Sequence, residues 1–273
     1  MEKKKITVKD KMWLFASPAH DDDFAFGKDG FIWRNISTIT PTEGAAMLGL
    51  KNMLMVTSAR TGKPVPFSAD AYGYMESFCR MDKVLWSITG SGGFRHGNEE
   101  EFICDIAGKY PNVVGGFLDD MFGKEETKEE DCIKRLKTIR EKLDRAPRPM
   151  ELWATCYVKD AKKYSASMYD PIDVITVWNM RTSEIVNLES NFKEYEELLP
   201  DKRKVLGMYI FDYTTGLPVS PEMMEMQCET GLKWLKEGRI DGIIFLTNCL
   251  MGLSFPGEYW LRDWLDKVGD QEL

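Results

Sequence analysis

The chain has 273 residues, 43% of them hydrophobic, and a formal net charge of −8. This hydrophobic content supplies a large core, which excludes a disordered chain and a small disulfide-stapled fold. Lys and Arg cluster densely only at Lys3-Lys4-Lys5, so the composition argues against nucleic acid as a partner. No stretch approaches the roughly 20 apolar residues of a membrane span, and we expect no membrane-spanning segment.

The six cysteines form no CxxC pair and no other spacing typical of a metal knuckle. Most of them fall in apolar segments, where a cysteine behaves as a small buried hydrophobic residue. Unpaired thiols are typical of a reducing compartment. We therefore expect a cytoplasmic protein, with a periplasmic or secreted one as the alternative if a leader has been removed.

Short apolar runs of strand type alternate with longer helical patterns along the chain. Most runs are continuously hydrophobic, which indicates strands buried on both faces, as in a parallel sheet. The expected strands, in chain order, are Met12–Ser17, Met53–Thr57, Val84–Ile88, Val113–Leu118, Leu152–Tyr157, Val174–Trp178, Val205–Phe211 and Gly242–Leu246.

The segments between these strands carry helix start signals. The first, Thr40-Pro41-Thr42-Glu43, combines a capping threonine, a proline in the first turn and a glutamate that can reach back. The later helices are expected to begin at Ser68, Asn98, Thr127, Ser220-Pro221 and Glu258.

Eight strand–helix units over roughly 250 residues predict an α/β fold, a (β/α)₈ TIM barrel. We expect a single domain over residues 1–273, with residues 1–11 as an N-terminal tail. An open doubly wound sheet is the structural alternative, but its usual glycine-rich turn does not follow the first strand. The connection from Pro18 to Thr40 is long, as is typical of a lid or binding loop.

Two carboxylates follow the fourth expected strand. Asp119 and Asp120 come directly after an apolar run, and Asp212 ends the seventh expected strand in the same way. Because side chains alternate along a strand, one aspartate of the pair should face the barrel mouth and the other the helices. Carboxylates on strands four and seven can converge over the mouth. Such a pair can cleave a glycosidic bond, with a protonated carboxyl as acid and an ionised one as nucleophile or base.

Polar and aromatic residues at the other strand ends are candidates for substrate binding. Flat platforms for a sugar ring would be supplied by four aromatic residues: Trp33, Trp178, Tyr157 and Tyr213. The run Gly90-Ser91-Gly92-Gly93 lacks the lysine of a phosphate-binding loop and is interpreted as a flexible loop. The predicted substrate-binding set is His20, Asp22, Arg60, His96, Tyr157, Trp178, Asn179, Tyr213 and Asn248; within it, Arg60, His20 and Asn179 would orient hydroxyls or a uronate.

The segment VVGGFLDDMF, Val113 to Phe122, resembles the fourth strand of glycoside-hydrolase-like barrels, especially the polygalactosaminidase type. There a Gly-hydrophobic-Asp stretch presents an acidic residue, which the resemblance places at Asp119 or Asp120. The whole chain also resembles a group of bacterial barrel proteins, through WLF, ITPTEGAAMLGLKN, GLKWLKEGRIDGIIFL and VGDQEL; this second resemblance implies the fold but no activity. The large retaining clan of glycosidases carries glutamates on strands four and seven, where this chain has aspartates.

The leading interpretation is a glycoside hydrolase that acts on an oligosaccharide or smaller sugar and needs no cofactor. One alternative is a metal-dependent sugar isomerase, epimerase or aldolase, in which His20, His96 and the carboxylates hold a divalent ion. No HxH or HExxH spacing supports that site. The other alternative is a sugar-binding barrel without catalysis.

Overall fold

The computed structural model describes residues 5–22, 36–121, 128–179 and 181–273. Eight strands form a closed barrel in the order β1-β10-β7-β6-β5-β4-β3-β2. The register pairs β3, β4, β5 and β6 in parallel, and pairs β1, β10 and β7 in parallel as well. Helices follow the strands in alternation, so the predicted (β/α)₈ class is confirmed.

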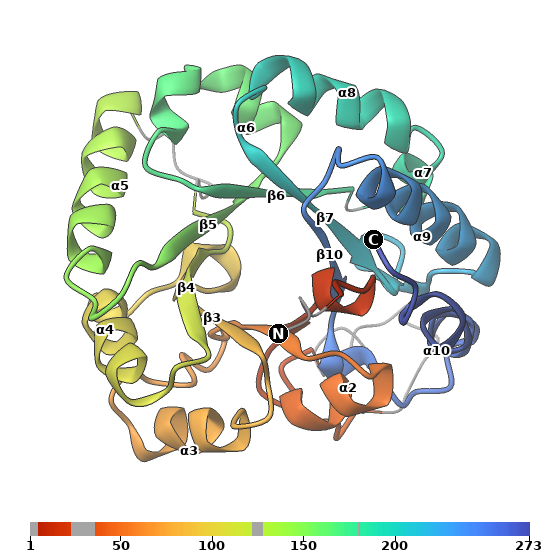
Figure 1. Ribbon diagram of the computed structural model, residues 1–273, viewed down its shortest axis with the longest axis horizontal. Helices are drawn as coiled ribbons and strands as arrows, with labels where there is room; N and C mark the ends of the chain where they lie inside the picture. Colours follow the sequence, from red (N-terminus) through yellow and green to blue (C-terminus); the bar gives the residue numbers. More distant parts are fainter. Residues whose placement is uncertain (1–4, 23–35, 122–127, 180) are drawn as a thin grey trace. The chain divides into compact units, whose positions relative to one another are not determined.

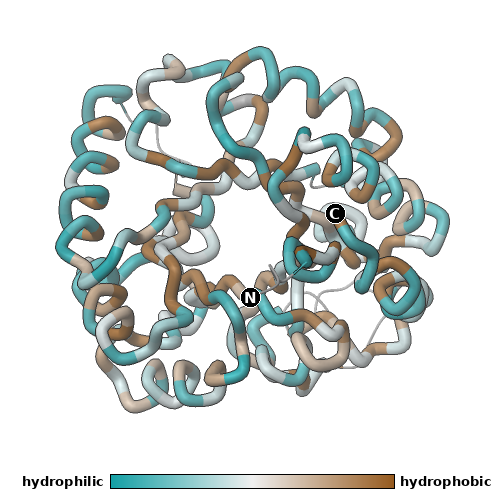
Figure 2. The backbone as a smooth tube through the Cα atoms, in the orientation of Figure 1, coloured by the Kyte–Doolittle hydropathy of each residue, from teal (hydrophilic) through white to brown (hydrophobic). Residues whose placement is uncertain are grey.

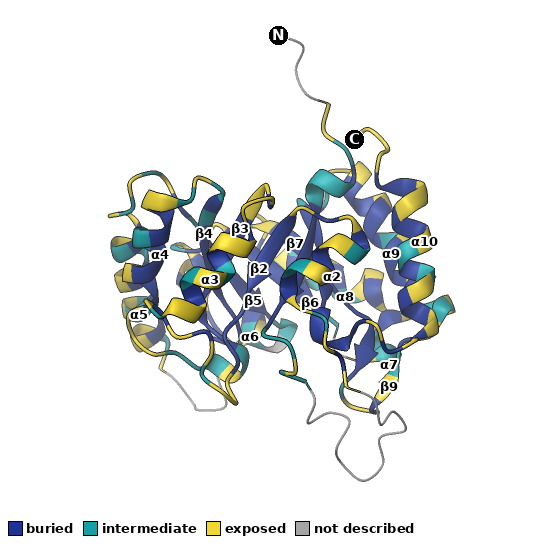
Figure 3. Cartoon of the chain, turned by 90° about the horizontal axis from the view of Figure 1, so that it is seen from below, coloured by how far each residue is buried: buried dark blue, intermediate teal, exposed yellow. Residues whose placement is uncertain are grey.

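The barrel strands are the apolar runs of the sequence. Nearly all their residues are buried, which explains why these runs are continuously hydrophobic rather than alternating; Figures 2 and 3 show the strands as hydrophobic and buried. The strands are β1 Met12–Ala16, β2 Asn52–Met55, β3 Lys83–Thr89, β4 Val113–Leu118, β5 Glu151–Cys156, β6 Val174–Trp178, β7 Arg203–Tyr209 and β10 Gly242–Leu246.

The seventh strand differs from its prediction. The strand β7 ends at Tyr209, whereas Phe211–Asp212 form a separate strand, β8, paired antiparallel with β9, Leu217–Pro218. The expected strand over Val205–Phe211 was therefore wrong at its end. The physical reason is the Asp212 carboxylate, which accepts hydrogen bonds from the Thr214 and Thr215 amides and closes a tight turn.

The helix caps mostly agree with the sequence signals. Thr40 and Glu43 form a complete capping box, and Ser68 and Ser220 each accept a backbone amide bond. Asn98 makes no capping bond; instead the Glu99 carboxylate accepts the His96 and Gly97 amides. The helices are α2 Pro41–Leu48, α3 Ala69–Ser77, α4 Glu99–Lys109, α5 Glu129–Leu143, α6 Val158–Lys163, α7 Thr182–Ile185, α8 Leu188–Leu198, α9 Pro221–Lys236 and α10 Pro256–Val268, with 3-10 turns η1 Lys9–Lys11, η2 Ser91–Gly93, η3 Ala166–Tyr169 and η4 Asn248–Leu250.

The chain divides into two compact units. The first comprises residues 1–53, 179–188 and 205–273, and includes β1, β7 and β10; the second comprises residues 54–178 and 189–204, and includes β3 to β6. In the first unit the two chain ends are joined, because the Val8 amide donates to the Gln271 carbonyl and Lys5 pairs with Glu272. Val8 is fully buried, so part of the predicted tail is packed against the C-terminus.

Candidate active site

In the second unit, the inward face of β4 is identified by a close helix contact. A Cβ atom at Gly116 would lie 3.2 Å from Ile103 of α4, so Gly116 faces the helices. Because side chains alternate, Phe117 and Asp119 face the barrel interior. Leu118 pairs with Ala154, which puts Asp119 level with Thr155 on β5.

Asp119 is a buried carboxyl, only 7% exposed. Thr155 Oγ1 donates to its Oδ1 over 3.2 Å. Burial and the negative charge of Asp120 raise its pKa, and hydrogen bonds from the Thr155 hydroxyl and the Asp120 amide only partly oppose them. The pKa of Asp119 therefore lies well above the usual range, and the carboxyl remains neutral where an ordinary aspartate is ionised.

Asp120 has a left-handed backbone, with φ of 44°. This conformation breaks the strand alternation and turns its carboxylate toward the carboxyl ends of β3 and β5. There it accepts the Gly92 amide over 3.1 Å and the Tyr157 hydroxyl over 3.1 Å. The expectation that one aspartate of the pair faces the helices was therefore wrong. The Gly92 donor belongs to η2, so the run interpreted as a flexible loop forms a 3-10 turn.

The pair thus has one neutral and one negatively charged carboxyl on adjacent residues. A buried carboxyl whose pKa is raised by burial and by a neighbouring negative charge is typical of acid–base sites. Two hydrogen-bond donors hold Asp120, and one hydroxyl and one amide hold Asp119. The arrangement can deliver a proton from Asp119 while Asp120 supplies negative charge.

The other predicted residues of the second unit divide into exposed and buried ones. Arg60 and His96 are exposed on the loops after β2 and β3, and His96 Nε2 lies 2.7 Å from the Gly62 carbonyl oxygen. Trp178 is 5% exposed, and its indole N–H donates to Thr176 Oγ1 over 2.9 Å. Its ring is therefore not presented to solvent as a platform.

In the first unit, Asp212 has both carboxylate oxygens occupied. Oδ1 accepts the Thr214 and Thr215 amides and the Thr214 hydroxyl, and Oδ2 accepts the amide and hydroxyl of Thr182. Burial raises the pKa of Asp212, but these hydrogen bonds outweigh it and lower the pKa to about 2. Asp212 is thus an ionised carboxylate that joins α7 to the β8–β9 hairpin.

A second polar cluster in the first unit consists of Asp22, Tyr213 and Cys249. Asp22 Oδ2 accepts the Tyr213 hydroxyl over 2.9 Å and the Cys249 thiol over 2.9 Å. Burial and the charge of Asp22 raise the pKa of both donors well above their usual values, so both keep their protons. Sequence reasoning treated Cys249 as a buried hydrophobic residue and missed this hydrogen bond, which no local pattern signals.

The remaining predicted residues of the first unit differ in accessibility. Asn248 is fully buried, and its amide bonds the backbone of Ser17 and Ile39. His20 is exposed with φ of 69°, and Asn179 is half-buried. Trp33 lies outside the described residues. Among those residues, no group of three or more His, Cys, Asp and Glu side chains is placed to hold a metal ion.

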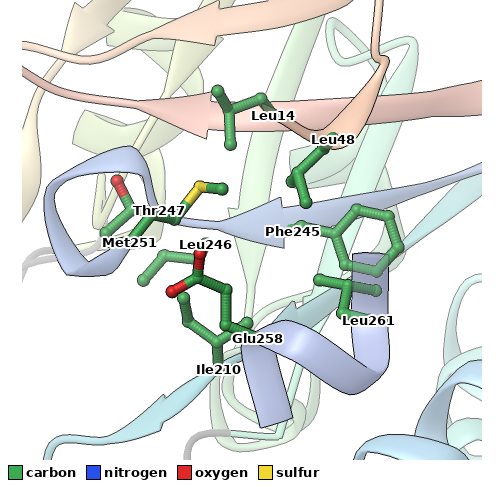
Figure 4. Close-up of a pocket in the computed structure, with 9 residues that line it drawn as sticks. All are labelled: Leu14, Leu48, Ile210, Phe245, Leu246, Thr247, Met251, Glu258 and Leu261. Atoms are coloured by element: carbon green, nitrogen blue, oxygen red, sulfur yellow. The ribbon is translucent and has the colours of Figure 1, made fainter. Parts of the chain in front are cut away.

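The first unit also has a small apolar cavity (Figure 4). The Glu258 side chain reaches its wall, is 2% exposed, and accepts the Gly252 amide over 2.9 Å. Burial raises the pKa of Glu258, and this outweighs the opposing Gly252 hydrogen bond and the Arg262 charge. The lining is otherwise almost wholly apolar: Leu14, Leu48, Ile210, Phe245, Leu246, Thr247, Met251 and Leu261.

The fold is similar to those of solved glycoside hydrolases. The glycoside hydrolase domain of PgaB (BpsB) from Bordetella bronchiseptica superposes with a TM-score of 0.57 at 9% identity, covering 96% of this chain and 99% of that one. The alpha-L-arabinofuranosidase from Thermotoga maritima superposes with a TM-score of 0.58 at 10% identity, covering 95% of this chain and 71% of that one. A family 18 chitinase from Crocus vernus superposes with a TM-score of 0.53 at 11% identity, covering 93% of this chain and 98% of that one.

Because these identities are low, the likeness shows the barrel fold alone. No protein-family model matches the chain, and no curated protein matches it. Within the described part of the chain, none of the helices combines the length and the apolar character needed to cross a membrane.

Proposed function

We propose that the protein is a glycoside hydrolase in which Asp119 is the proton donor and Asp120 the ionised partner. The observation that carries this proposal is the neutral, inward-facing Asp119 beside the negative charge of Asp120 at the carboxyl end of β4. In this fold, catalytic residues come from the carboxyl ends of the strands. The similarity to barrels of glycoside hydrolases supports the same chemistry, although fold alone does not assign it.

The proposed reaction begins with cleavage of the bond between the anomeric carbon and the leaving oxygen. Asp119 gives its proton to that oxygen and becomes a carboxylate. The positive charge that develops on the sugar ring is stabilised by Asp120, which the Gly92 amide and Tyr157 hydroxyl hold in place. Water then adds to the anomeric carbon and returns a proton to Asp119, so the enzyme recovers its starting state.

The proposal gives Asp212 a different role from the one expected from sequence. Its five hydrogen bonds leave it serving as a structural anchor, so we assign it to positioning the β8–β9 hairpin. Tyr213 and Asp22 in that region carry a hydroxyl and a carboxylate next to the rings of Tyr209 and Phe211. In the first unit we propose Tyr213 and Asp22 as sugar-binding groups, with the exposed His20 and the half-buried Asn179. In the second unit we propose the exposed Arg60 and His96 as sugar-binding groups.

The test is hydrolysis of a broad panel of oligosaccharides and polysaccharides, with products followed by mass spectrometry. Wild-type protein should cleave at least one glycan, and Asp119→Asn and Asp120→Asn should each lower the rate by a factor of about 10²–10⁴. Asp82→Asn, at an exposed site just before β3, is the matched control and should retain activity.

Two outcomes would point to the alternatives. Tight glycan binding with no turnover across the panel would indicate a binding barrel. Sugar isomerisation or carbon–carbon cleavage that EDTA abolishes and a divalent ion restores would indicate the metal-dependent class. Full activity in both aspartate variants would contradict the assignment of residues.

A further inference from the structure

A chain of hydrogen bonds crosses β6, β5 and β4 and ends on Asp119. The Trp178 indole N–H donates to Thr176 Oγ1 over 2.9 Å, and Thr176 Oγ1 donates to Thr155 Oγ1 over 3.4 Å. Thr155 Oγ1 then donates to Asp119 Oδ1 over 3.2 Å. Thr155 and Thr176 are register partners on neighbouring strands, and Thr155 is level with Asp119. The chain is therefore one row of side chains on the inward face of the sheet.

The row is buried throughout. Thr176 is fully buried, and Thr155 and Trp178 are 2% and 5% exposed. A polar group without a partner in such a place would cost roughly 1–3 kcal/mol, so each hydroxyl has to find its hydrogen-bond partners among the buried groups beside it. Buried hydrogen bonds in series also polarise and strengthen one another.

The first member sets the direction of the chain. An indole N–H donates and cannot accept, so Thr176 Oγ1 accepts a hydrogen bond from Trp178 and must donate its own hydrogen bond to another group. The acceptors within reach are Thr155 Oγ1 at 3.4 Å and the Ala154 carbonyl at 3.5 Å. Thr155 has Asp119 Oδ1 as its own acceptor. The direction thus runs from Trp178 toward the carboxyl.

Building on the proposed function, we infer that Trp178, Thr176 and Thr155 are positioning residues that fix Asp119 Oδ1 as a hydrogen-bond acceptor and leave the acidic proton on Oδ2. A neutral carboxyl has one protonated oxygen, and the oxygen that receives a hydroxyl donor is the unprotonated one. The hydrogen-bond chain therefore determines that Oδ2 of Asp119 carries the proton that the substrate receives. It also holds the carboxyl in one rotamer.

The row gives Trp178 a role that its position in the sequence did not suggest. At a strand end, an aromatic residue is expected to stack on a sugar ring, whereas here its indole N–H supports the acid through two hydroxyls. Thr155 and Thr176 were not singled out as candidates, because a threonine inside an apolar strand gives no sign of which donors lie beside it.

The test is a titration of the Asp119 carboxyl in the free protein, labelled with ¹³C at the aspartate γ-carbon and assigned by comparison with Asp119→Asn. Thr155→Val keeps the shape and removes the donor to Asp119. We expect the pKa of Asp119 to rise, and Thr155→Ser to restore it. Thr176→Val should raise it by a smaller amount, because Thr155 then loses its polarising donor. Thr138→Val, at an exposed position on α5, should change nothing.

If a substrate is cleaved, Thr155→Val should lower kcat/KM by roughly tenfold and move the alkaline limb of its pH profile to higher pH. Thr155→Ser should restore both the rate and the pH profile. The titration needs no activity, so it separates this inference from the proposed function. If the pKa of Asp119 rises in Thr155→Val but no glycan is cleaved, the result supports the hydrogen-bond chain and contradicts the hydrolase assignment. An unchanged pKa in folded Thr155→Val, or in Thr176→Val if the first variant does not fold, overturns the inference.

Discussion

The Tyr157 hydroxyl donates a hydrogen bond to Asp120 Oδ1 over 3.1 Å, from the residue that directly follows β5. The Gly92 amide supplies the second donor, from the turn after β3. The ends of β3 and β5, the two strands that flank β4, therefore supply the donors to the carboxylate of Asp120. Burial and the charge of this carboxylate raise the pKa of Asp119.

Tyr157→Phe should reduce kcat/KM by roughly 10–100-fold, because the carboxylate of Asp120 loses a donor worth about 1.5–3 kcal/mol. The matched control is Tyr259→Phe, which removes a hydroxyl from an exposed residue of α10. Steady-state kinetics on the best glycan of the panel measure both. Equal rates for wild type and Tyr157→Phe would remove Tyr157 from the site.

Asp119→Asn should make the protein more stable at neutral and alkaline pH. The pKa of Asp119 is raised in the folded protein, so its contribution to stability is complete below the unfolded pKa of about 4 and is lost as the pH rises toward the folded pKa. The asparagine variant does not undergo this loss. Thermal denaturation of both proteins between pH 3.5 and 8 measures the difference, which should grow with pH; a constant or shrinking difference would contradict the raised pKa.

Asp212→Asn should destabilise the protein by about 1–3 kcal/mol at pH 7, because an amide nitrogen would face hydrogen-bond donors. The folded pKa of Asp212 is about 2, so its stabilisation is present above the unfolded pKa of about 4 and disappears as the pH falls toward 2. Urea denaturation at several pH values tests this, with the exposed Asp263→Asn as control. A large loss of kcat in a fully stable Asp212→Asn would instead favour a catalytic role.

Glu258→Gln should weaken the pH dependence of stability above pH 5. Its raised folded pKa means that wild-type stability falls as the pH rises through that pKa, whereas glutamine stays neutral and still accepts the Gly252 amide. The side chain borders the apolar cavity of Figure 4, where a charge is poorly solvated. Thermal denaturation of both proteins from pH 5 to 9 measures this. The same change of Tm with pH in the two proteins would contradict the prediction.

The fold could be predicted from the sequence because the signals that specify its strands and helices are local. Continuous apolar runs predicted the buried parallel strands, and the Thr40–Glu43 capping box was present as predicted. The error at the seventh strand came from Phe211, whose apolar side chain continues the pattern although the backbone has already turned. Hydrophobicity reports burial, and Phe211 is buried in a hairpin as fully as it would be in a strand.

The candidate site could be predicted from the sequence only in part. The abrupt stop of β4 at two carboxylates predicts Asp119 and Asp120 as catalytic candidates, and this stays a prediction; alternation predicted opposite faces for them. That rule fails where the backbone becomes left-handed, as it does at Asp120. The donors Gly92, Thr155 and Thr176 come from neighbouring strands and turns, and pairings across strands leave no trace in a single sequence.

The most direct measurement of the central claim compares leaving groups in Asp119→Asn. Using the sugar that the wild type cleaves best, the rates are measured on a natural glycoside and on an aryl glycoside whose phenol leaves without protonation. If Asp119 is the proton donor, the variant should lose a factor of about 10²–10⁴ on the natural glycoside and remain close to wild type on the activated one. Equal losses on both substrates would show that Asp119 does not protonate the leaving group.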